Sequence, residues 1–210
     1  MSGTLYLCAT PIGNLEDITL RVLRTLQEVD VIAAEDTRNT IKLLNHFEIK
    51  TPMTSYHEYN KVDKAAYLVE QLANGKNIAL VTDAGTPAIS DPGEELVKQA
   101  YAAGIPVTSL PGACACVTAL TLSGLSTRRF AFEAFLPSDK KLRRKILDSL
   151  CTETRTVIIY EAPHKMKTTL GDLKETLKDR KIVLARELTK IHEEFIRKSI
   201  DELLSEIDTI

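Results

Sequence analysis

The stretch that decides the fold is "LVTDAGTPAISDPG", residues 80–93. An apolar run ends at Asp83, and two glycines, two prolines and a second aspartate follow within ten residues. Glycine has no Cβ, so such a loop lets the main chain approach a ligand closely. The stretch therefore predicts a ligand-binding loop at the end of a β-strand.

Around this loop, short apolar runs alternate with amphipathic segments, a pattern typical of β-α-β units. The order predicts an α/β fold with a mostly parallel sheet. We expect Asp91 to cap a helix that ends at Gly104. The predicted strands cover residues 4–10, 29–35, 52–56, 77–82 and 105–110, and the predicted helices cover 19–29, 37–47, 60–74 and 91–104.

The composition shifts after a small-residue segment, residues 109–126, which predicts a turn followed by a tightly packed helix. Strands of a second sheet are predicted at 129–136, 155–162, 181–189 and 192–200, the last two as an antiparallel hairpin, with a helical segment at 201–210. The short gap between the last two strands requires the hairpin. We predict an N-terminal α/β domain at 1–112, a junction helix at 113–126 and a C-terminal α/β domain at 127–210.

The charge is unevenly distributed along the 210 residues. Residues 1–126 carry nine Lys and Arg against fourteen Asp and Glu, whereas residues 127–210 carry eighteen against fifteen. Five of the six residues 140–145 are basic, which favours a polyanionic partner, although a solvated helix face also explains such a run. No apolar run is long enough for a membrane helix, and no signal peptide is evident, so we expect a cytoplasmic protein without a membrane partner.

Three Gly- and Pro-rich turns, residues 9–17, 82–93 and 110–115, follow the first, fourth and fifth predicted strands. Ligands of open α/β sheets bind at the carboxyl ends of the strands. The sequence contains no G-x-G-x-x-G dinucleotide fingerprint, no P-loop and no G-x-S-x-G nucleophile elbow. These features favour a nucleoside ligand that loops can hold without the usual phosphate-binding motif.

Seven motifs occur in one order along the chain: "TPIGNLEDIT" (10–19), "EDTR" (35–38), "SYHEYN" (55–60), "VTDAGTPAISDPG" (81–93), "PGACACVTAL" (111–120), "YEAPHK" (160–165) and "ARELTKIHEEF" (185–195). Together they resemble the tetrapyrrole methylase superfamily, over essentially the whole chain. They are most similar to its branch that 2′-O-methylates a cytidine ribose in the decoding region of 16S ribosomal RNA.

The resemblance implies two α/β domains with S-adenosylmethionine in the cleft between them, a homodimer, no metal, and 16S rRNA in the small ribosomal subunit as substrate. Members of the family generally run longer and add a closing strand, so we expect a truncated form whose activity needs testing. The residues that the resemblance assigns to the cofactor are Pro11, Gly13, Asp83, Ala84, Gly85, Thr86, Ile89, Cys114, Ala115, Ala162 and Pro163.

Methyl transfer to a ribose oxygen depends mainly on alignment, and a base or a nearby cation would assist it. The base is not assigned by the motifs. Its leading candidates are Glu35, His57, His164 and Lys190, with Asp36, Glu58, Lys165 and Glu187 as further acids and bases of the same motifs. The predicted RNA-binding residues are Arg38, Arg128, Lys140, Lys141, Arg143, Arg144 and Lys145, with Arg129 and Arg186 as further cations.

Two other functions are compatible with parts of this pattern. The first is methylation of a corrin precursor on the same fold. The second is a non-catalytic module that binds RNA or the cofactor without turnover. The basic run and the "EDTR" and "SYHEYN" motifs favour the rRNA methylase over the first alternative.

Overall fold

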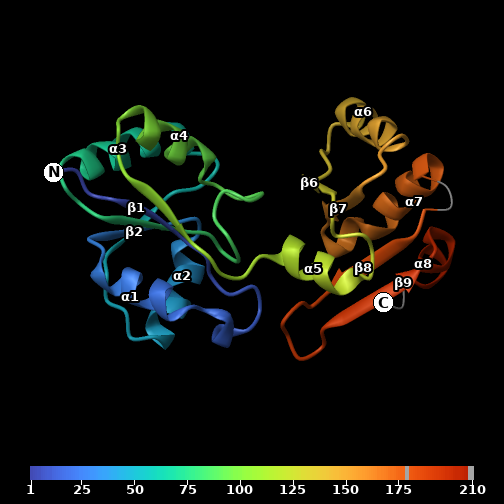
Figure 1. Cartoon of the computed structure of the whole chain (residues 1–210), viewed down its shortest axis with the longest axis horizontal. Helices are drawn as coiled ribbons and strands as arrows, with labels where there is room; N and C mark the ends of the chain where they lie inside the picture. The colour runs from blue at the N-terminus through green and yellow to red at the C-terminus, as the bar shows by residue number, and fades with distance from the viewer. Residues whose placement is uncertain (178–179, 208–210) are drawn as a thin grey trace. The chain divides into compact units, whose positions relative to one another are not determined.

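The computed structural model describes residues 1–177 and 180–207 (Figure 1). The chain folds into two compact units, Met1–Ala115 (unit 1) and Cys116–Ile210 (unit 2). Each unit combines helices with strands of its own. The two units are therefore described one after the other.

Unit 1 is built on a five-stranded sheet in the order β3-β2-β4-β1-β5, in which every neighbouring pair is parallel. The register places Leu5 of β1 beside both Ile78 of β4 and Val107 of β5. The predicted parallel sheet is confirmed. Its strands are β1 (Leu5–Cys8), β2 (Val31–Ala34), β3 (Met53–Ser55), β4 (Ile78–Val81) and β5 (Val107–Leu110).

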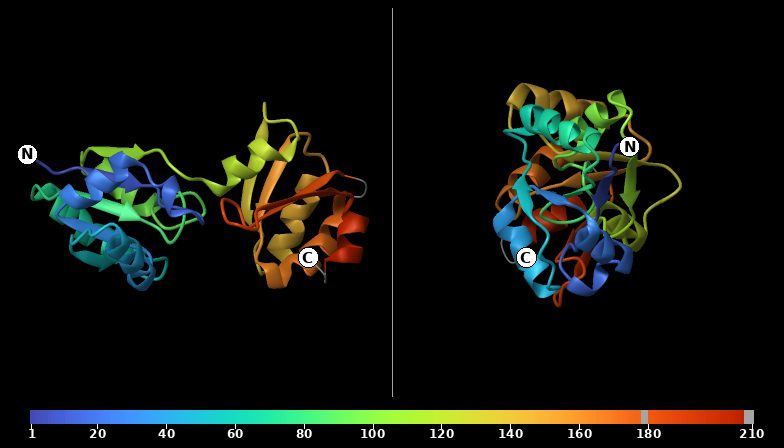
Figure 2. Two further views of the ribbon diagram at one scale, coloured as in Figure 1. Left: turned by 90° about the horizontal axis from the view of Figure 1, so that it is seen from below. Right: turned by 90° about the vertical axis from the view of Figure 1, so that its left-hand side faces the viewer.

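Helices cover both faces of this sheet, with α3 and α4 on one face and α1 and α2 on the other (Figures 1 and 2). The polar residue before each of α1 and α2 explains where these helices start. Thr19 accepts a hydrogen bond from the Val22 N–H, and Asp36 accepts one from the Arg38 N–H. The helices are η1 (Leu15–Asp17), α1 (Leu20–Glu28), α2 (Thr37–His46), α3 (Lys61–Ala73) and α4 (Glu94–Ala102).

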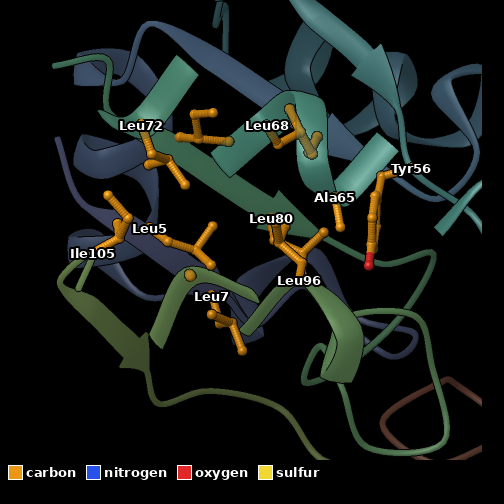
Figure 3. Packing of buried hydrophobic residues seen from close by; sticks show 12 residues of the cluster. Leu5, Leu7, Tyr56, Ala65, Leu68, Leu72, Leu80, Leu96 and Ile105 are labelled. Atoms are coloured by element: carbon orange, nitrogen blue, oxygen red, sulfur yellow. The ribbon is translucent and has the colours of Figure 1, made fainter. Parts of the chain in front are cut away.

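Strand β4 lies at the centre of unit 1, and all four of its residues are fully buried. Ile78 and Leu80 pack with α3 and α4, whereas Ala79 and Val81 pack with α1 and α2, because successive side chains point to opposite faces. Figure 3 shows Leu80 between Leu5 of β1 and Leu96 of α4. Burial on both faces explains why this segment reads as one uninterrupted apolar run.

The predicted start of the fourth helix at Asp91 is wrong. Helix α4 begins at Glu94, its N-cap is Gly93, and no side chain caps it. Gly93 has φ +152°, and a Cβ there would lie 3.0 Å from both Ala88 Cβ and Leu80 Cδ2. The loop therefore makes a last tight turn against β4 before the helix starts, which leaves Asp91 outside the capping position.

Unit 2 begins with α5, the helix predicted in the small-residue segment, and continues with two pairs of strands. Strands β6 and β7 are parallel, with an irregular register between Phe132 and Ala134. Its elements are α5 (Ala115–Ser123), β6 (Phe130–Phe135), α6 (Lys140–Leu150), β7 (Thr156–Tyr160), η2 (Pro163–Lys165), α7 (Met166–Leu177), β8 (Ile182–Arg186), β9 (Glu194–Lys198) and α8 (Ile200–Glu206).

The antiparallel hairpin of β8 and β9 is confirmed, but the single second sheet is not. Within the described residues, β6-β7 and β8-β9 form two separate two-stranded sheets. Val157 and Ile159 of β7 and Ile182 of β8 line a cavity of about 320 Å³, so β7 and β8 border a cavity instead of pairing in one ladder.

The core of unit 2 centres on Leu136, Leu147, Leu173 and Ile200, which join α6, α7 and α8. Helix α8 begins at a complete capping box between Ser199 and Glu202. The end of the predicted 201–210 segment, residues 208–210, lies outside the described residues. Over residues 1–177 and 180–207, no helix combines the length and the apolar character needed to cross a membrane.

Candidate functional site

Two of the three predicted ligand loops of unit 1 are joined by main-chain hydrogen bonds. The Thr10 N–H donates to the Gly85 carbonyl over 2.9 Å, and the Gly85 N–H donates to the Thr10 carbonyl over 3.0 Å. The third loop joins them through the Thr86 hydroxyl, which donates to the Ala113 carbonyl over 3.0 Å. Because β4, β1 and β5 are neighbours in the sheet, their carboxyl ends bring these loops to one edge.

Gly85 is required at the centre of this arrangement. Its φ of +91° belongs to the region that favours glycine, and a Cβ would lie 3.3 Å from Ile12 Cγ2 and 3.6 Å from the Ala113 carbonyl oxygen. Ala88 and Ser90 also have positive φ, at 68° and 64°. Such conformations cost on the order of 1–3 kcal/mol each, and they cluster at ligand sites.

A cavity of about 360 Å³ opens beside the first two loops. Helix α2 contributes one face to it, since Asn39, Lys42 and His46 follow each other at helical spacing. The amide of Asn39 donates to the Asp83 carboxylate over 3.1 Å. Thr10 and Thr82 also line this cavity.

Thr82 carries the strongest indication of a ligand in this cavity. The residue is 2% exposed, and its Oγ1 has no hydrogen-bond partner in the described part of the chain. A buried hydroxyl without a partner destabilises a protein by about 1–3 kcal/mol. Thr82 lines the cavity, but its Oγ1 is itself buried, so a polar group of a ligand can supply the missing partner only when the surrounding loop shifts.

Acidic side chains follow two strands at the same edge, Glu35 after β2 and both Asp83 and Asp91 after β4. Glu35 accepts a hydrogen bond from the Asp83 N–H over 3.2 Å. Burial raises the pKa of the Glu35 carboxyl, while that hydrogen bond acts in the opposite direction. Burial, followed by the charges of Glu35 and Asp83, raises the pKa of Asp91 to about 6. Glu35 and Asp91 therefore hold their protons more strongly than exposed acids do.

Two further residues of the predicted site, Arg38 and His57, also follow strands at this edge, and they differ in exposure. Arg38 donates to Asp36 from Nε and Nη2, and its side-chain hydrogen bond lowers the pKa of Asp36 to about 2. The Arg38 side chain remains 87% exposed. His57 follows β3, and its Nδ1 is buried with no partner among the described residues.

The remaining predicted cofactor residues divide between the two units. In unit 1, Pro11 and Gly13 line the 360 Å³ cavity, and exposed Ile89 donates its N–H to the Thr86 carbonyl. Cys114 and Ala115 follow the Ala113 carbonyl that Thr86 contacts. In unit 2, Ala162 is the N-cap of η2 and Pro163 its first residue.

The predicted bases and cations of unit 2 lie in four places. Lys190 donates to Glu187 over 2.9 Å in the loop of the β8-β9 hairpin, and Arg128 is exposed before β6. His164 and Lys165 line a second cavity together with Lys140, Arg143 and Arg144. Lys141 and Lys145 line a separate open groove on another side of α6.

Three residues of the unit 1 site were missed by the sequence-based predictions. Lys42 and His46 could have been found from their helical spacing after the "EDTR" motif. Thr82 carried no such signal, because its lack of a partner depends on the packing of distant segments. Over residues 1–177 and 180–207, no group of three or more His, Cys, Asp or Glu is arranged to hold a metal ion.

Comparison with known proteins gives the class of this molecule. The family model described as "Tetrapyrrole (Corrin/Porphyrin) Methylases" matches residues 4–204. The chain therefore belongs to the tetrapyrrole methylase family, and it is a methyltransferase by family.

Curated relatives are 45 to 56% identical to this chain in sequence. Three proteins named "Ribosomal RNA small subunit methyltransferase I" illustrate the range. The chain is 56% identical to the one from Halalkalibacterium halodurans, covering 95% of this chain and 69% of the relative. It is 53% identical to the one from Bacillus subtilis (96% and 69%). It is 45% identical to the one from Thermotoga maritima (98% and 92%).

Solved structures agree on the fold. Diphthine synthase matches with a TM-score of 0.73 at 17% identity, over 97% of this chain and 84% of that one. Uroporphyrin-III C-methyltransferase from Thermus thermophilus, complexed with S-adenosyl homocysteine, matches with a TM-score of 0.67 at 19% identity, over 97% and 91%. At these identities the likeness confirms the α/β tetrapyrrole methylase fold.

Proposed function

We propose that this protein transfers the methyl group of S-adenosylmethionine to the 2′-hydroxyl of a cytidine ribose in the decoding region of 16S ribosomal RNA. One observation carries the proposal: relatives with 45 to 56% identity over at least 95% of the chain are named as ribosomal RNA small subunit methyltransferases. The corrin-precursor alternative has only the superfamily fold behind it, because the solved cobalt precorrin-4 methyltransferase is 17% identical to this chain.

The loop at residues 82–86 fits a cofactor that is held by main-chain atoms. Asp83 and Ala84 are exposed between the buried Thr82 and Gly85, so their main chain is accessible at the edge of the sheet. S-adenosylmethionine, when bound, supplies a methyl group already activated by its sulfonium charge. The task left to Thr82, Asp83 and Gly85 is to bind and orient.

Orientation is the main contribution expected of this fold. Alignment of the ribose oxygen with the methyl group converts a bimolecular reaction into one within a complex, which is worth up to about 7–11 kcal/mol of the barrier. The hydrogen bonds that tie Thr10 to Gly85 and Thr86 to Ala113 make the unit 1 part of the site rigid. A rigid loop needs little reorganisation when the reactants bind.

The ribose hydroxyl must lose a proton as its oxygen gains the methyl group. We assign the proton acceptor to Glu35, with Asp91 as the second carboxyl of the pair. The pKa of both groups is raised, so each holds a proton more strongly than an exposed acid does, while Asp91, at about 6, is still mostly ionised at neutral pH. His57, with its buried Nδ1, is the next candidate in unit 1.

The decisive experiment supplies tritiated S-adenosylmethionine and small ribosomal subunits that lack the modification. Label in a 2′-O-methylcytidine of the decoding region supports the proposal. Label that appears only in a porphyrinoid substrate would instead favour the corrin-precursor function. Binding of cofactor or RNA without any transfer would identify a non-catalytic binding module.

The same proposal places the protein in the cytoplasm as a homodimer that needs no metal. Helices of unit 1 are the surface proposed for dimer formation. Exposed apolar side chains on α3 and α4, such as Tyr67 and Tyr101, are available to such a contact. Light scattering at micromolar concentration tests it, and a monomeric mass would contradict it.

A further inference from the structure

Unit 2 contains a cavity that the cofactor loops of unit 1 do not share. Its volume is about 510 Å³, and it lies where the parallel strands β6 and β7 end and where α6 and η2 begin. Lys140, Arg143, Arg144, His164 and Lys165 line it, and Asp172 is the acid among its lining residues. Its lining is therefore strongly cationic.

The acid of this cavity is already neutralised by one of the arginines. Arg143 donates from Nε to Asp172 over 2.7 Å and from Nη2 to the Thr169 hydroxyl over 2.8 Å. Thr169 in turn donates to Glu161 over 2.5 Å. With its side chain only 16% exposed, Arg143 serves as a structural link between α6 and α7.

The other cations of the cavity differ in whether they already form ion pairs. Arg144 lies in ion pairs with Asp148 at 2.9 Å and with Glu175 at 3.9 Å. Lys140, His164 and Lys165 are exposed, and no side chain of the three has a hydrogen bond or ion pair with the residues that the structure describes. These three side chains can therefore turn toward a ligand without breaking an existing contact.

The chemistry of the lining selects an anion. Lysine ammonium groups on flexible stems bind phosphate as point charges, and the Thr168 hydroxyl adds a donor. The apolar side chains of Leu136 and Leu147 form the buried wall. The lining contains no Phe, Tyr or Trp ring on which a base could stack, and His164 offers the lone imidazole among the lining residues, which favours recognition of the backbone over recognition of the base.

Two other lysines of α6, Lys141 and Lys145, do not line this cavity. Lys141 and Lys145 line an open groove on α6 together with Asp139 and Asp148. Arg144 lines both the groove and the cavity and is paired with Asp148, so the groove has three cations beside two acids and is less cationic than the cavity. The cavity and the groove thus separate two halves of a basic run that is continuous in sequence.

We propose that Lys140, His164 and Lys165 form a phosphate-binding site for the backbone of the RNA substrate. The identity of the ligand as RNA rests on the proposed function, whereas the anion site itself rests on the cavity and its free cations. The site would fix one phosphodiester of the strand at the carboxyl edge of β6 and β7.

The test compares two double variants of the whole chain: Lys140→Ala with Lys165→Ala, and the control Lys141→Ala with Lys145→Ala. Each removes two positive charges, and three of the four positions are on α6. Fluorescence anisotropy with a 16S rRNA decoding-region fragment gives affinity over a range of salt. Calorimetry with pyrophosphate measures anion binding without RNA.

For the cavity variant we expect RNA affinity to fall about tenfold and the salt slope to fall by about 1, because the contact with one phosphodiester is lost. Pyrophosphate binding should weaken in parallel. Lys141 and Lys145 were also predicted from the basic run to bind RNA, but they do not line the cavity, so the control variant should lower RNA affinity less than the cavity variant does and leave pyrophosphate binding unchanged. Equal losses in both variants, or no loss in the cavity variant, would overturn the proposed site.

The outcomes also separate this proposal from the proposed function. If the wild-type protein methylates 16S rRNA but both variants bind it equally well, the phosphate site is wrong and the function stands. If pyrophosphate binding depends on Lys140 and Lys165 while no rRNA is methylated, the anion site stands and the function is wrong.

Discussion

The main chains of Thr10 and Gly85 hold each other through two reciprocal hydrogen bonds of 2.9 and 3.0 Å. This pair joins the loop after β1 to the loop after β4, at the centre of the parallel sheet. Any side chain at Gly85 would have to fit a φ of +91° and press on Ile12. The pairing of these two residues therefore links the shape of the fold to the proposed cofactor site.

Gly85→Val should abolish measurable binding of S-adenosylmethionine, because a branched side chain cannot adopt this φ and would displace the loop. Calorimetric titration of the whole chain with S-adenosylmethionine measures this affinity. Gly104→Val is the matched control, since Gly104 also has positive φ, at +68°, but a Cβ there meets nothing within 4 Å. Equal loss of binding in both variants would show that backbone strain alone, and not the loop, is responsible.

Thr82→Val should leave the melting temperature unchanged or raise it, because the substitution removes a buried hydroxyl that has no partner among the described residues. Ligand binding should weaken by about tenfold, as expected for one lost hydrogen bond. Thr10→Val is the comparison. Its hydroxyl donates to the Thr82 carbonyl over 3.2 Å, so its loss should destabilise the protein by about 1 kcal/mol. A destabilised Thr82→Val would contradict the inference of a ligand contact.

Glu35→Gln should lower kcat about 100-fold or more while leaving the affinity for S-adenosylmethionine within a few-fold, because the amide cannot accept the proton. The readout is methyl transfer to small subunits at saturating cofactor. Glu58→Gln provides the control, since Glu58 belongs to the neighbouring motif but forms an exposed pair with Lys61. An unchanged kcat for Glu35→Gln would move the role of base to His57 or Asp91.

Asp91 should make stability depend on pH in a defined direction. Its folded pKa of about 6 lies above its ordinary value of 3.8, so the folded state holds the proton more tightly than the unfolded chain does. This contribution is fully present below about pH 4 and is lost as pH rises through 6. Asp91→Asn should therefore gain melting temperature relative to wild type at pH 7 and not at pH 4.

Arg143→Ala should destabilise unit 2 by roughly 1–3 kcal/mol, because it leaves Asp172 and the Thr169 hydroxyl without their charged partner. Arg144→Ala should cost less than about 0.5 kcal/mol, since its pair with Asp148 is exposed and one helical turn apart. Chemical denaturation measures both. A larger cost at Arg144 than at Arg143 would contradict the structural role assigned to Arg143.

Much of the fold could be predicted from local patterns. The apolar runs located all nine strands of the described residues to within a few positions, and the gap between the last two strands predicted the hairpin. Thr19 and Asp36 act as helix caps because a side-chain oxygen at that position bonds a nearby N–H. Asp91 does not cap, because Gly93 inserts a turn against β4 before the helix begins.

Local sequence patterns were enough to predict the β-α-β order, the three Gly- and Pro-rich turns and the motifs of the methylase family. Those properties depend on neighbouring residues and their spacing, so they can be read along the chain. Only the tertiary structure decided that Thr82 is buried without a partner among the described residues and that burial raises the pKa of Glu35 and Asp91. It also divided the basic run of α6 into a structural Arg143, a cavity with Lys140 and an outer face with Lys141. The reason is physical: burial, partner atoms and local charge come from segments far apart in sequence, and no local pattern encodes them.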